Sequence, residues 1–569
     1  MNAFVRRVNG PLVEADRLTG VAMAELVEVG ADRLPAEVVA LRPDRVTLQA
    51  YEYTGGVAPG DPVTALGRPL AALLGPGLLG GIYDGLLRPL HGAATWLAPG
   101  ARRAADGRRA ADGRRWRFTP AAGTGDLLGA VDAGPLEHRV LVPPGVGGPV
   151  TWVAPAGEYR ADEVVATVGG VGVPLATWWP VRRPRPYRER LDSVAPLLTG
   201  QRVLDAVFPV ARGGTAAVPG GFGTGKTVLL QQIAKWCDAD VIVYVGCGER
   251  GNEMADVVAE LGELTDPRTG GRLAERTVVI ANTSNMPIMA REASIYTGVT
   301  VAEYYRDMGY DAVVIADSTS RWAEALREFA SRTGALPAEE GYPAGLASAL
   351  AAFYERAGRF TTLGGRDGSV TVVGAVSPPG GDMTEPVTAH TQRFVRTLWT
   401  LDRDLAYARH YPAVTWVGSY CRDAGAVGAW YAGQGDPGWA ERRGRAVALL
   451  AEADRLAALA ELVGVGALPG HERMVILAGR LIREGVLQQS ALSANDAHCT
   501  PQKSAALVDS VLDVIATCDE LVEAGAPATT IEEADFSPLL RAREETGPSD
   551  VDGVRRHLDR ISALLRGLS

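Results

Sequence analysis

The octapeptide GGFGTGKT, residues 220 to 227, limits what this chain can fold into more than any other feature. It fits G-x-x-x-x-G-K-[ST], and it lies between the strand-like TAAVPG and the helix-like TVLLQQIAKW. A strand, a glycine-rich turn and a helix in this order aim loop N–H groups and a helix N-terminus at one point. The sequence therefore predicts a phosphate-binding loop made of Gly220, Gly221, Phe222, Gly223, Thr224, Gly225, Lys226 and Thr227.

Lysine is scarce in this chain, with three lysines among 57 basic residues. Lys226 is expected to place a compact charge between the β- and γ-phosphates of a nucleotide, a position that the wider arginine fork does not fit. The hydroxyl of Thr227 is expected to bind Mg²⁺ directly. Lys235 and Lys503 are interpreted as ordinary surface lysines.

The composition of the 569 residues indicates three or four domains of a globular protein. A net charge of −10 argues against a general role on nucleic acid or membrane surfaces. The five cysteines lack metal-ligand spacing, and MNAFVRRVNG has no apolar core, which favours reduced, buried thiols in a cytosolic protein. The uncharged run VVATVGGVGVPLATWWPV is interpreted as short strands and turns, because glycine and proline interrupt it.

Four regions follow from the residue patterns, and together they predict a multidomain α/β protein. Residues 1–67 alternate apolar and polar positions, as in a small β-barrel. Residues 68–185 are rich in Gly, Pro and Trp, and residues 186–435 alternate apolar strands with helices, as in a parallel sheet. Residues 436–569 show helical spacing only. The tandem RRAADG at 102–113 is interpreted as a solvated surface loop rather than a basic recognition loop.

Three residues outside the loop are candidates for chemistry. Glu249 follows the strand DVIVYVGCG and is expected at the same sheet edge as the loop, where a carboxylate can deprotonate the attacking water. Its alternative is a surface ion pair with Arg250. Asp317 ends the strand DAVVIAD, where an acid belongs to the Mg²⁺ shell, and a helix N-cap role is compatible with that. Tyr411 is either an adenine-stacking residue or a core tyrosine.

Long segments of the chain resemble the catalytic A (alpha) subunits of V-type and archaeal-type (V/A-type) rotary ATPases and ATP synthases. They include GPGLLGGIYDGLLRPL, WRFTP, GCGERGNEM, ADSTSRWAEALRE, SPPGGDMTEPVT and LAYARHYPAVTW. The resemblance implies a β-barrel, a bulge domain inserted at about residues 95–180, a RecA-like P-loop domain and a helical C-terminal domain. It implies that Glu249 is the catalytic carboxylate, that Arg250 faces the γ-phosphate, and that Tyr411 contacts adenine.

The same resemblance implies ATP or ADP with Mg²⁺ as ligands, and ATP hydrolysis or synthesis coupled to proton or sodium transport. It implies a B-type partner in an A3B3 ring, central and peripheral stalk subunits, and a cytoplasmic place at the membrane without insertion into it. An arginine from a neighbouring subunit would complete the site, so the chain alone is expected to be a poor enzyme.

The chain departs from the family pattern at two positions. Gly221 stands where proline is usual and is expected to loosen the loop slightly, and Leu492 stands where an aromatic wall of the adenine pocket is usual. Two rival functions remain at this point: a homohexameric ATPase of the flagellar or type III secretion class, and a nucleotide-binding structural subunit without turnover. The presence of both Lys226 and Glu249 disfavours the second.

Overall fold

A computed structural model describes residues 3–16, 18–90, 114–122, 125–266 and 268–567 of the chain. The RRAADG repeat lies outside these residues, and its surface-loop interpretation remains a prediction. The chain divides into two compact units. The first contains residues 1–192, 239–377 and 383–394, and the second contains residues 193–238, 378–382 and 395–569.

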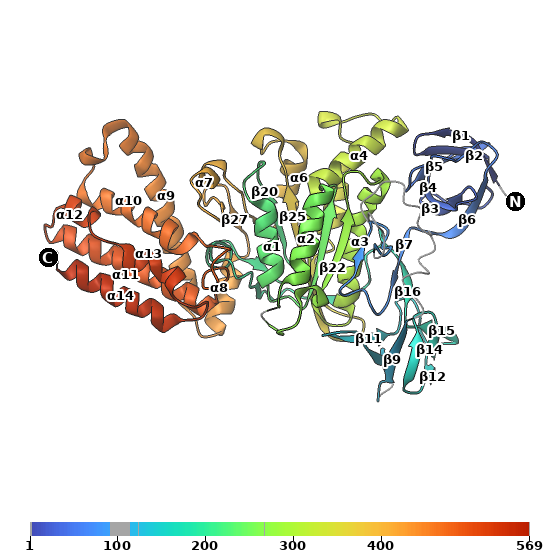
Figure 1. Ribbon diagram of the computed structural model, residues 1–569, viewed down its shortest axis with the longest axis horizontal. Coiled ribbons are helices and arrows are strands. Elements are labelled where there is room, and N and C mark those ends of the chain that lie inside the picture. Colours follow the sequence, from blue (N-terminus) through green and yellow to red (C-terminus); the bar gives the residue numbers. More distant parts are fainter. Residues whose placement is uncertain (1–2, 17, 91–113, 123–124, 267, 568–569) are drawn as a thin grey trace. The chain divides into compact units, whose positions relative to one another are not determined.

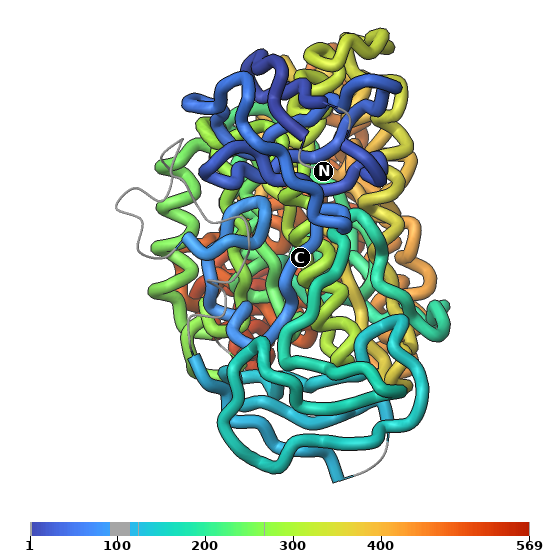
Figure 2. The backbone as a smooth tube through the Cα atoms, turned by 90° about the vertical axis from the view of Figure 1, so that its right-hand side faces the viewer, coloured from blue at the N-terminus to red at the C-terminus, as the bar shows by residue number. Residues whose placement is uncertain are grey.

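The first unit begins with a closed six-stranded barrel in the order β1-β2-β5-β4-β3-β6, the dark-blue part of Figure 2. Its strands are β1 Ala3–Asn9, β2 Leu12–Asp16, β3 Glu25–Val29, β4 Leu34–Leu41, β5 Arg45–Ala50 and β6 Pro62–Pro69. Alternate side chains such as Val13, Val27 and Leu48 fill its core. The barrel prediction is confirmed, although the expected strand GVAMAELVEV forms only from Glu25 onward.

Residues 114–182 contribute small antiparallel sheets to the first unit. One has the order β11-β10-β9-β13, and the other has the order β12-β14-β15. Their strands are β9 Arg115–Pro120, β10 Leu127–Asp132, β11 Glu137–Leu141, β12 Val150–Val153, β13 Gly157–Arg160, β14 Val164–Val168 and β15 Val171–Pro174. β16 Thr177–Pro180 pairs with β7 Ala71–Leu74. The uncharged run therefore forms β14, β15 and β16, as its glycines and prolines predict.

A parallel sheet with the order β25-β23-β21-β22-β8 forms the rest of the first unit. Its strands are β8 Ile82–Tyr83, β21 Val241–Cys247, β22 Thr277–Asn282, β23 Asp311–Asp317 and β25 Asp367–Val376. β24 Gly358–Thr361 pairs antiparallel with β25 and also with β17 Glu189–Arg190. The helices are α2 Gly251–Glu263, α3 Ile288–Asp307, α4 Thr319–Thr333, α5 Leu346–Tyr354 and α6 Pro386–Phe394. α3 packs on β21, β22, β23 and β25. Nearly every residue of β21 to β25 is buried, as expected for apolar strands in a covered sheet.

The second unit contains the glycine-rich loop and most of the helices. β20 Thr215–Pro219 pairs in parallel with β26 Thr397–Leu398, which pairs with β27 Tyr420–Cys421, and β18 Pro196–Leu197 pairs with β19 Val210–Ala211. Its helices are α1 Lys226–Trp236, α7 Arg403–Tyr407, α8 Ala424–Gly433, α9 Trp439–Val463, α10 Gly470–Ile482, α11 Pro501–Glu523, α12 Ala528–Glu532, α13 Ser537–Glu545 and α14 Val551–Arg566.

The C-terminal helices form a bundle in which α11 packs against both α10 and α14 (Figure 1). Apolar side chains at helical spacing, such as Leu507, Val511 and Ile515 on α11, are buried. This confirms the predicted helical C-terminal region. Within the described residues, none of the helices has the length and apolarity needed to span a bilayer.

The structure corrects the predicted exposure of Lys503 and the predicted burial of Cys421. Lys503 is not a surface lysine, because its side chain is 0% exposed. Its Nζ donates to three backbone oxygens, at 3.2 Å to Asn495, 2.9 Å to Arg543 and 2.9 Å to Thr546. All five cysteines are free, as predicted, but Cys421 is only half-buried while the other four are buried. Lys235 is half-buried, with its amine 4.8 Å from the ring centroid of Trp236.

We expect Lys503→Met to lower the free energy of unfolding of this chain by about 3 kcal/mol or more, because each buried polar group left without a partner costs about 1–3 kcal/mol. Urea unfolding followed by circular dichroism would measure the loss. Lys235→Met is the matched control, since that lysine is partly solvated. Equal stability of the two variants would contradict the structural role of Lys503.

Candidate functional site

The glycine-rich loop joins β20 to α1 and has the backbone that its sequence demands. Gly223 and Gly225 have φ of +78° and +86°, in the left-handed region that favours glycine. A Cβ at Gly220 would lie 2.8 Å from Leu401 Cβ, which also requires glycine there. At Gly221 a Cβ would lie 3.5 Å from Arg403 Nη2, an ordinary contact. The structure therefore has room for a side chain at Gly221.

Lys226 is the first residue of α1, and its half-buried side chain folds over the loop. Its Nζ donates to the carbonyl oxygens of Gly220 and Gly221, at 2.5 Å and 3.2 Å. Thr227 follows in the first turn of α1, where the N–H groups at the helix N-terminus favour a negatively charged ligand. The lysine, the loop and the helix end thus form the cradle expected for a phosphate chain.

Tyr411 lies against this loop. A Cβ on Gly225 would lie 3.3 Å from Tyr411 Cε1. The residue is 43% exposed, so the alternative of a core tyrosine is wrong. An aromatic ring beside a phosphate loop, with one part accessible, offers a stacking surface for a nucleobase. The structure thus places Tyr411 with the loop in the second unit.

The acidic candidates lie together in the first unit. β21 and β23 are parallel neighbours, with Gly246 opposite Asp317. Glu249 follows the end of β21 and Asp317 ends β23, so both lie at the carboxyl edge of the sheet, where ligands bind in open α/β sheets. Asp317 is buried, and its Oδ2 accepts a hydrogen bond of 3.1 Å from the hydroxyl of Tyr244, a contact that the sequence did not predict.

The N-cap alternative for Asp317 is wrong, because Ser318 caps α4. The Oγ of Ser318 accepts from the backbone N–H of Arg321 at 3.4 Å. The segment ADSTSRW places this serine one residue after the acid, and serine is among the preferred N-cap residues. Asp317 therefore does not serve as the cap.

Glu249 has a pKa that suits proton transfer at neutral pH. Burial raises the pKa of this carboxyl to about 7, and the negative charges of Asp317 and Glu253 add to the rise, while Arg321 opposes it. A base with a pKa near the working pH combines the right protonation state with a useful driving force. The side chain of Arg321 influences this carboxylate from α4, and only the fold reveals that influence.

Arg250 is exposed and begins α2 as its N-cap residue. Its side chain is 71% exposed, and its Nε lies 3.9 Å from Glu253 Oε1. The alternative of a surface pair between Glu249 and Arg250 is wrong, since the ion pair in the described structure joins Arg250 to Glu253. An exposed guanidinium beside a base is free to meet an anionic group.

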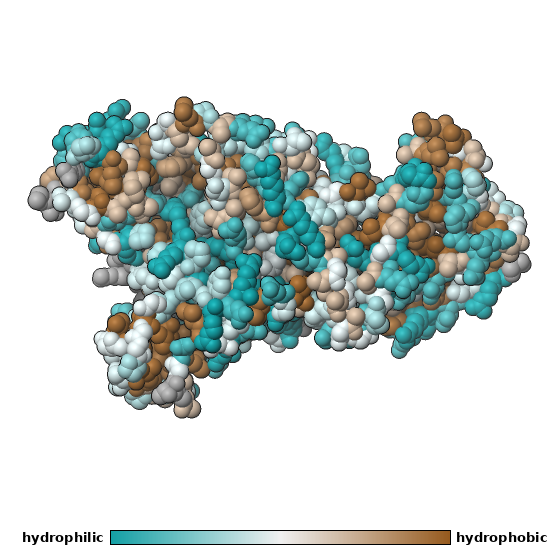
Figure 3. Space-filling view, turned by 180° about the vertical axis from the view of Figure 1, so that it is seen from behind, coloured by the Kyte–Doolittle hydropathy of each residue, from teal (hydrophilic) through white to brown (hydrophobic). Residues whose placement is uncertain are grey.

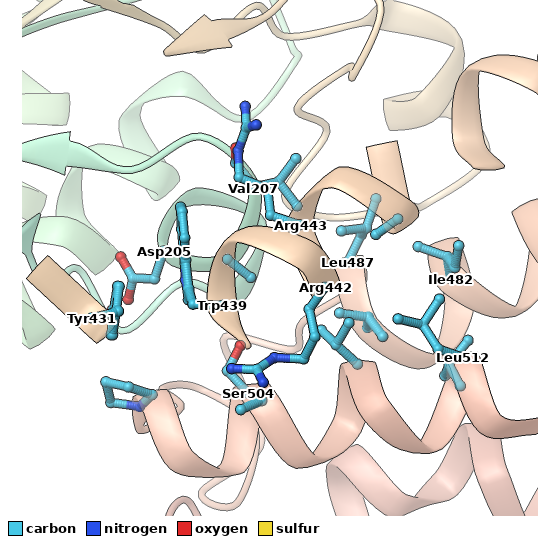
Figure 4. Close-up of a pocket in the computed structure, with 17 residues that line it drawn as sticks. Asp205, Val207, Tyr431, Trp439, Arg442, Arg443, Ile482, Leu487, Ser504 and Leu512 are labelled. Atoms are coloured by element: carbon cyan, nitrogen blue, oxygen red, sulfur yellow. The ribbon is translucent and has the colours of Figure 1, made fainter. Parts of the chain in front are cut away.

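A separate pocket of the second unit is lined mainly by apolar side chains. Figure 4 shows Ile482, Leu487 and Leu512 gathered on the side opposite Asp205 and Tyr431. Asp205 is buried, and its carboxylate accepts bonds from Thr199 and Gly200 in its own segment. Arg442, Arg443 and Ser504 also line this pocket, but none of the residues assigned above to the nucleotide does.

Comparisons with known proteins place the chain in a family. Residues 5–67 match the beta-barrel domain of the ATP synthase alpha/beta family, residues 111–182 its barrel-sandwich domain and residues 200–421 its nucleotide-binding domain. Residues 428–524 match the C-terminal domain of V and A type ATP synthase. A V-type ATP synthase alpha chain of Nitrosococcus oceani is 52% identical over 550 residues, covering 94% of this chain and 93% of its own. The chain belongs to the ATP synthase alpha/beta family.

Other members of the ATP synthase alpha/beta family extend this likeness over nearly the whole chain. The corresponding A-type ATP synthase protein of Thermofilum pendens is 46% identical, covering 99% of this chain and 96% of its own. The V-type ATP synthase alpha chain of Anaeromyxobacter sp. (strain K) is 49% identical, covering 100% and 99%. The chain is accordingly a P-loop ATPase of the rotary V/A type, which confirms the resemblance seen in its sequence.

A solved structure shares the fold at lower identity. The ATPase EscN of the type III secretion system of enteropathogenic E. coli is 21% identical, with a TM-score of 0.64, covering 90% of this chain and 100% of its own. This likeness concerns the fold alone. The rival secretion function loses support, because the close relatives belong to V-type and A-type ATP synthases.

Proposed function

We propose that Lys226 and Glu249 both serve ATP hydrolysis and synthesis, the roles that family membership implies for a phosphate-loop lysine and a catalytic carboxylate. The observation that carries this proposal is the pKa of Glu249, which burial raises to about 7. The same chain also has a complete phosphate loop. Lys226 and the N-terminus of α1 hold the β- and γ-phosphates, and Glu249 accepts the proton of the attacking water.

Mg²⁺ fits the residues at hand. Thr227 offers a hydroxyl oxygen in the first turn of α1, and Asp317 offers a buried carboxylate at the sheet edge, and hard oxygen ligands of this kind suit Mg²⁺. In this proposal Thr227 would be a direct ligand of the ion, and Asp317 would belong to its outer shell. When bound, the ion neutralises charge on the phosphate oxygens.

Arg250 and Tyr411 are proposed to make two further contacts with the nucleotide. The exposed guanidinium of Arg250 stabilises the γ-phosphate, and Tyr411 stacks on adenine. Leu492 replaces the usual aromatic residue and is 99% exposed, so it is available to contact the base as an aliphatic wall. A neighbouring subunit supplies the arginine finger, so the isolated chain turns over slowly.

Family membership supports a proposal about the partners. We propose an A3B3 ring with a non-catalytic B-type subunit, in contact with central and peripheral stalk subunits, on the cytoplasmic side of a membrane and without insertion into it. The ring couples ATP turnover to proton or sodium transport. An apolar patch at the end of α9 supports burial by another protein, since Leu459, Leu462, Val463 and Val465 are exposed there (Figure 3).

Purification of the native complex tests this assembly. Stoichiometric B-type and stalk subunits would support the rotary complex. A ring made of this chain alone would instead favour the secretion-type rival.

We expect kcat/KM for MgATP hydrolysis to fall about tenfold per pH unit below about pH 7, because protonated Glu249 cannot accept a proton. Glu253→Gln should move this limb to lower pH, since Glu253 raises the pKa of Glu249. A pH–rate profile of the native complex at constant ionic strength measures both effects. A flat profile through neutral pH would contradict the role of Glu249.

A further inference from the structure

A fully buried arginine in the second unit is bonded to one distant segment of the chain. Arg202 donates from its backbone N to Gln489 Oε1 at 2.8 Å, and from Nε to the Val486 oxygen at 2.7 Å. Its two terminal nitrogens donate to Asp496 Oδ1 at 2.6 Å and to the Gln488 oxygen at 2.5 Å. All four partners lie between residues 486 and 496. Arg202 therefore fixes this segment through an entire guanidinium fork.

Asp496 binds Arg202, Arg543 and the backbone of its own segment. It is also fully buried, and its Oδ2 accepts from Arg543 Nη1 at 2.7 Å and from the Ser490 backbone at 2.8 Å. Lys503 Nζ donates to the backbone carbonyl of Asn495, the residue before Asp496. A buried ion cluster is weak ground for stability, because desolvation offsets attraction, so a cluster of this kind is better understood by the geometry that it fixes.

The geometry that Arg202 fixes includes Tyr411. Gln489 accepts from Arg202, and its Nε2 donates to the Gly200 oxygen at 2.9 Å. The backbone N–H of Gln489 donates to the backbone carbonyl oxygen of Tyr411 at 2.8 Å. Gln489 thus joins the buried arginine to the tyrosine that lies against the phosphate loop. The segment from 486 to 496 also carries Leu492, which is fully exposed. The buried bonds of Arg202 and Asp496 therefore hold a backbone whose Leu492 side chain faces solvent.

We propose that Arg202 is a positioning residue for the nucleobase, acting through Gln489 on Tyr411. This inference rests on the proposed role of Tyr411 at adenine. Arg202 touches neither base nor phosphate. It holds the backbone that carries Tyr411 and Leu492, so the apolar face for the base is formed before the nucleotide arrives. Preorganisation of this kind adds affinity by lowering the ordering cost of binding.

The test compares a ligand that has a base with one that lacks it. Native complexes carrying Arg202→Lys or Gln489→Met would be titrated with MgATP and with magnesium tripolyphosphate. Lysine keeps the charge but not the fork, and methionine keeps the backbone N–H but neither side-chain bond. We expect either variant to weaken MgATP binding about five- to tenfold and tripolyphosphate binding less than about twofold. KM for ATP should rise while kcat stays within about twofold.

Arg473→Lys is the matched control, since Arg473 makes another two-bond pair with a carboxylate, Glu532, in the same unit. It should change neither ligand's affinity. Equal losses for ATP and tripolyphosphate, or no loss for either, would overturn the positioning role. If Arg202→Lys fails to assemble, Gln489→Met decides alone. Wild-type complex that binds neither ligand would instead remove the phosphate site on which the proposed function depends.

Discussion

Replacing Glu249 by glutamine in the assembled complex should slow ATP hydrolysis by about 10²–10⁴-fold and leave ATP binding intact, which is the usual effect of removing a general base. Glutamine has nearly the same shape as glutamate but cannot accept the proton of the attacking water. The carboxyl suits this role because burial and the neighbouring Asp317 and Glu253 raise its pKa to about 7. Single-turnover hydrolysis and equilibrium binding of MgATP together measure the effect.

Glu253→Gln is the control for this experiment. Glu253 lies in the first turn of α2, pairs with Arg250, and raises the pKa of Glu249 through its charge and a side-chain hydrogen bond. Above neutral pH its variant should hydrolyse ATP at close to the wild-type rate. A Glu249→Gln complex with near wild-type turnover would end the assignment of Glu249, and equal losses in both variants would show that the acidic cluster matters as a whole.

Lys226→Arg should lower both ATP affinity and turnover, the latter by at least about 100-fold, since misplacing a charge by about 1 Å costs that much. Arginine keeps the positive charge, but its planar fork is wider than an ammonium group. The structure leaves little room for it, because Lys226 Nζ already lies within 3.2 Å of two carbonyl oxygens of its own loop. Hydrolysis by the assembled complex and equilibrium ATP binding measure both losses.

The control is Lys235→Arg on the same helix. Lys235 is half-buried beside the Trp236 ring, which arginine can also stack on. This variant should keep wild-type affinity and turnover. Normal activity of Lys226→Arg would refute the argument that geometry, rather than charge, keeps a lysine at this position in an arginine-rich chain.

The sequence predicted the phosphate loop because all of its determinants are local. Left-handed backbone at Gly223 and Gly225, the lysine folded onto the loop and the helix start at Lys226 all lie within eight consecutive residues. The strand ends that carry Glu249 and Asp317 were predictable for a similar reason, since apolar runs mark buried strands and their carboxyl ends share one edge.

Only the tertiary structure decided what Lys503 and Arg202 do. The sequence around Lys503 resembles any exposed helix start, but the oxygens that its Nζ binds belong to Asn495, Arg543 and Thr546. The partners of Arg202 lie more than 280 residues away along the chain. A local motif carries its own geometry, whereas a buried charge is defined by the distant groups that compensate it, and folding alone brings those groups together.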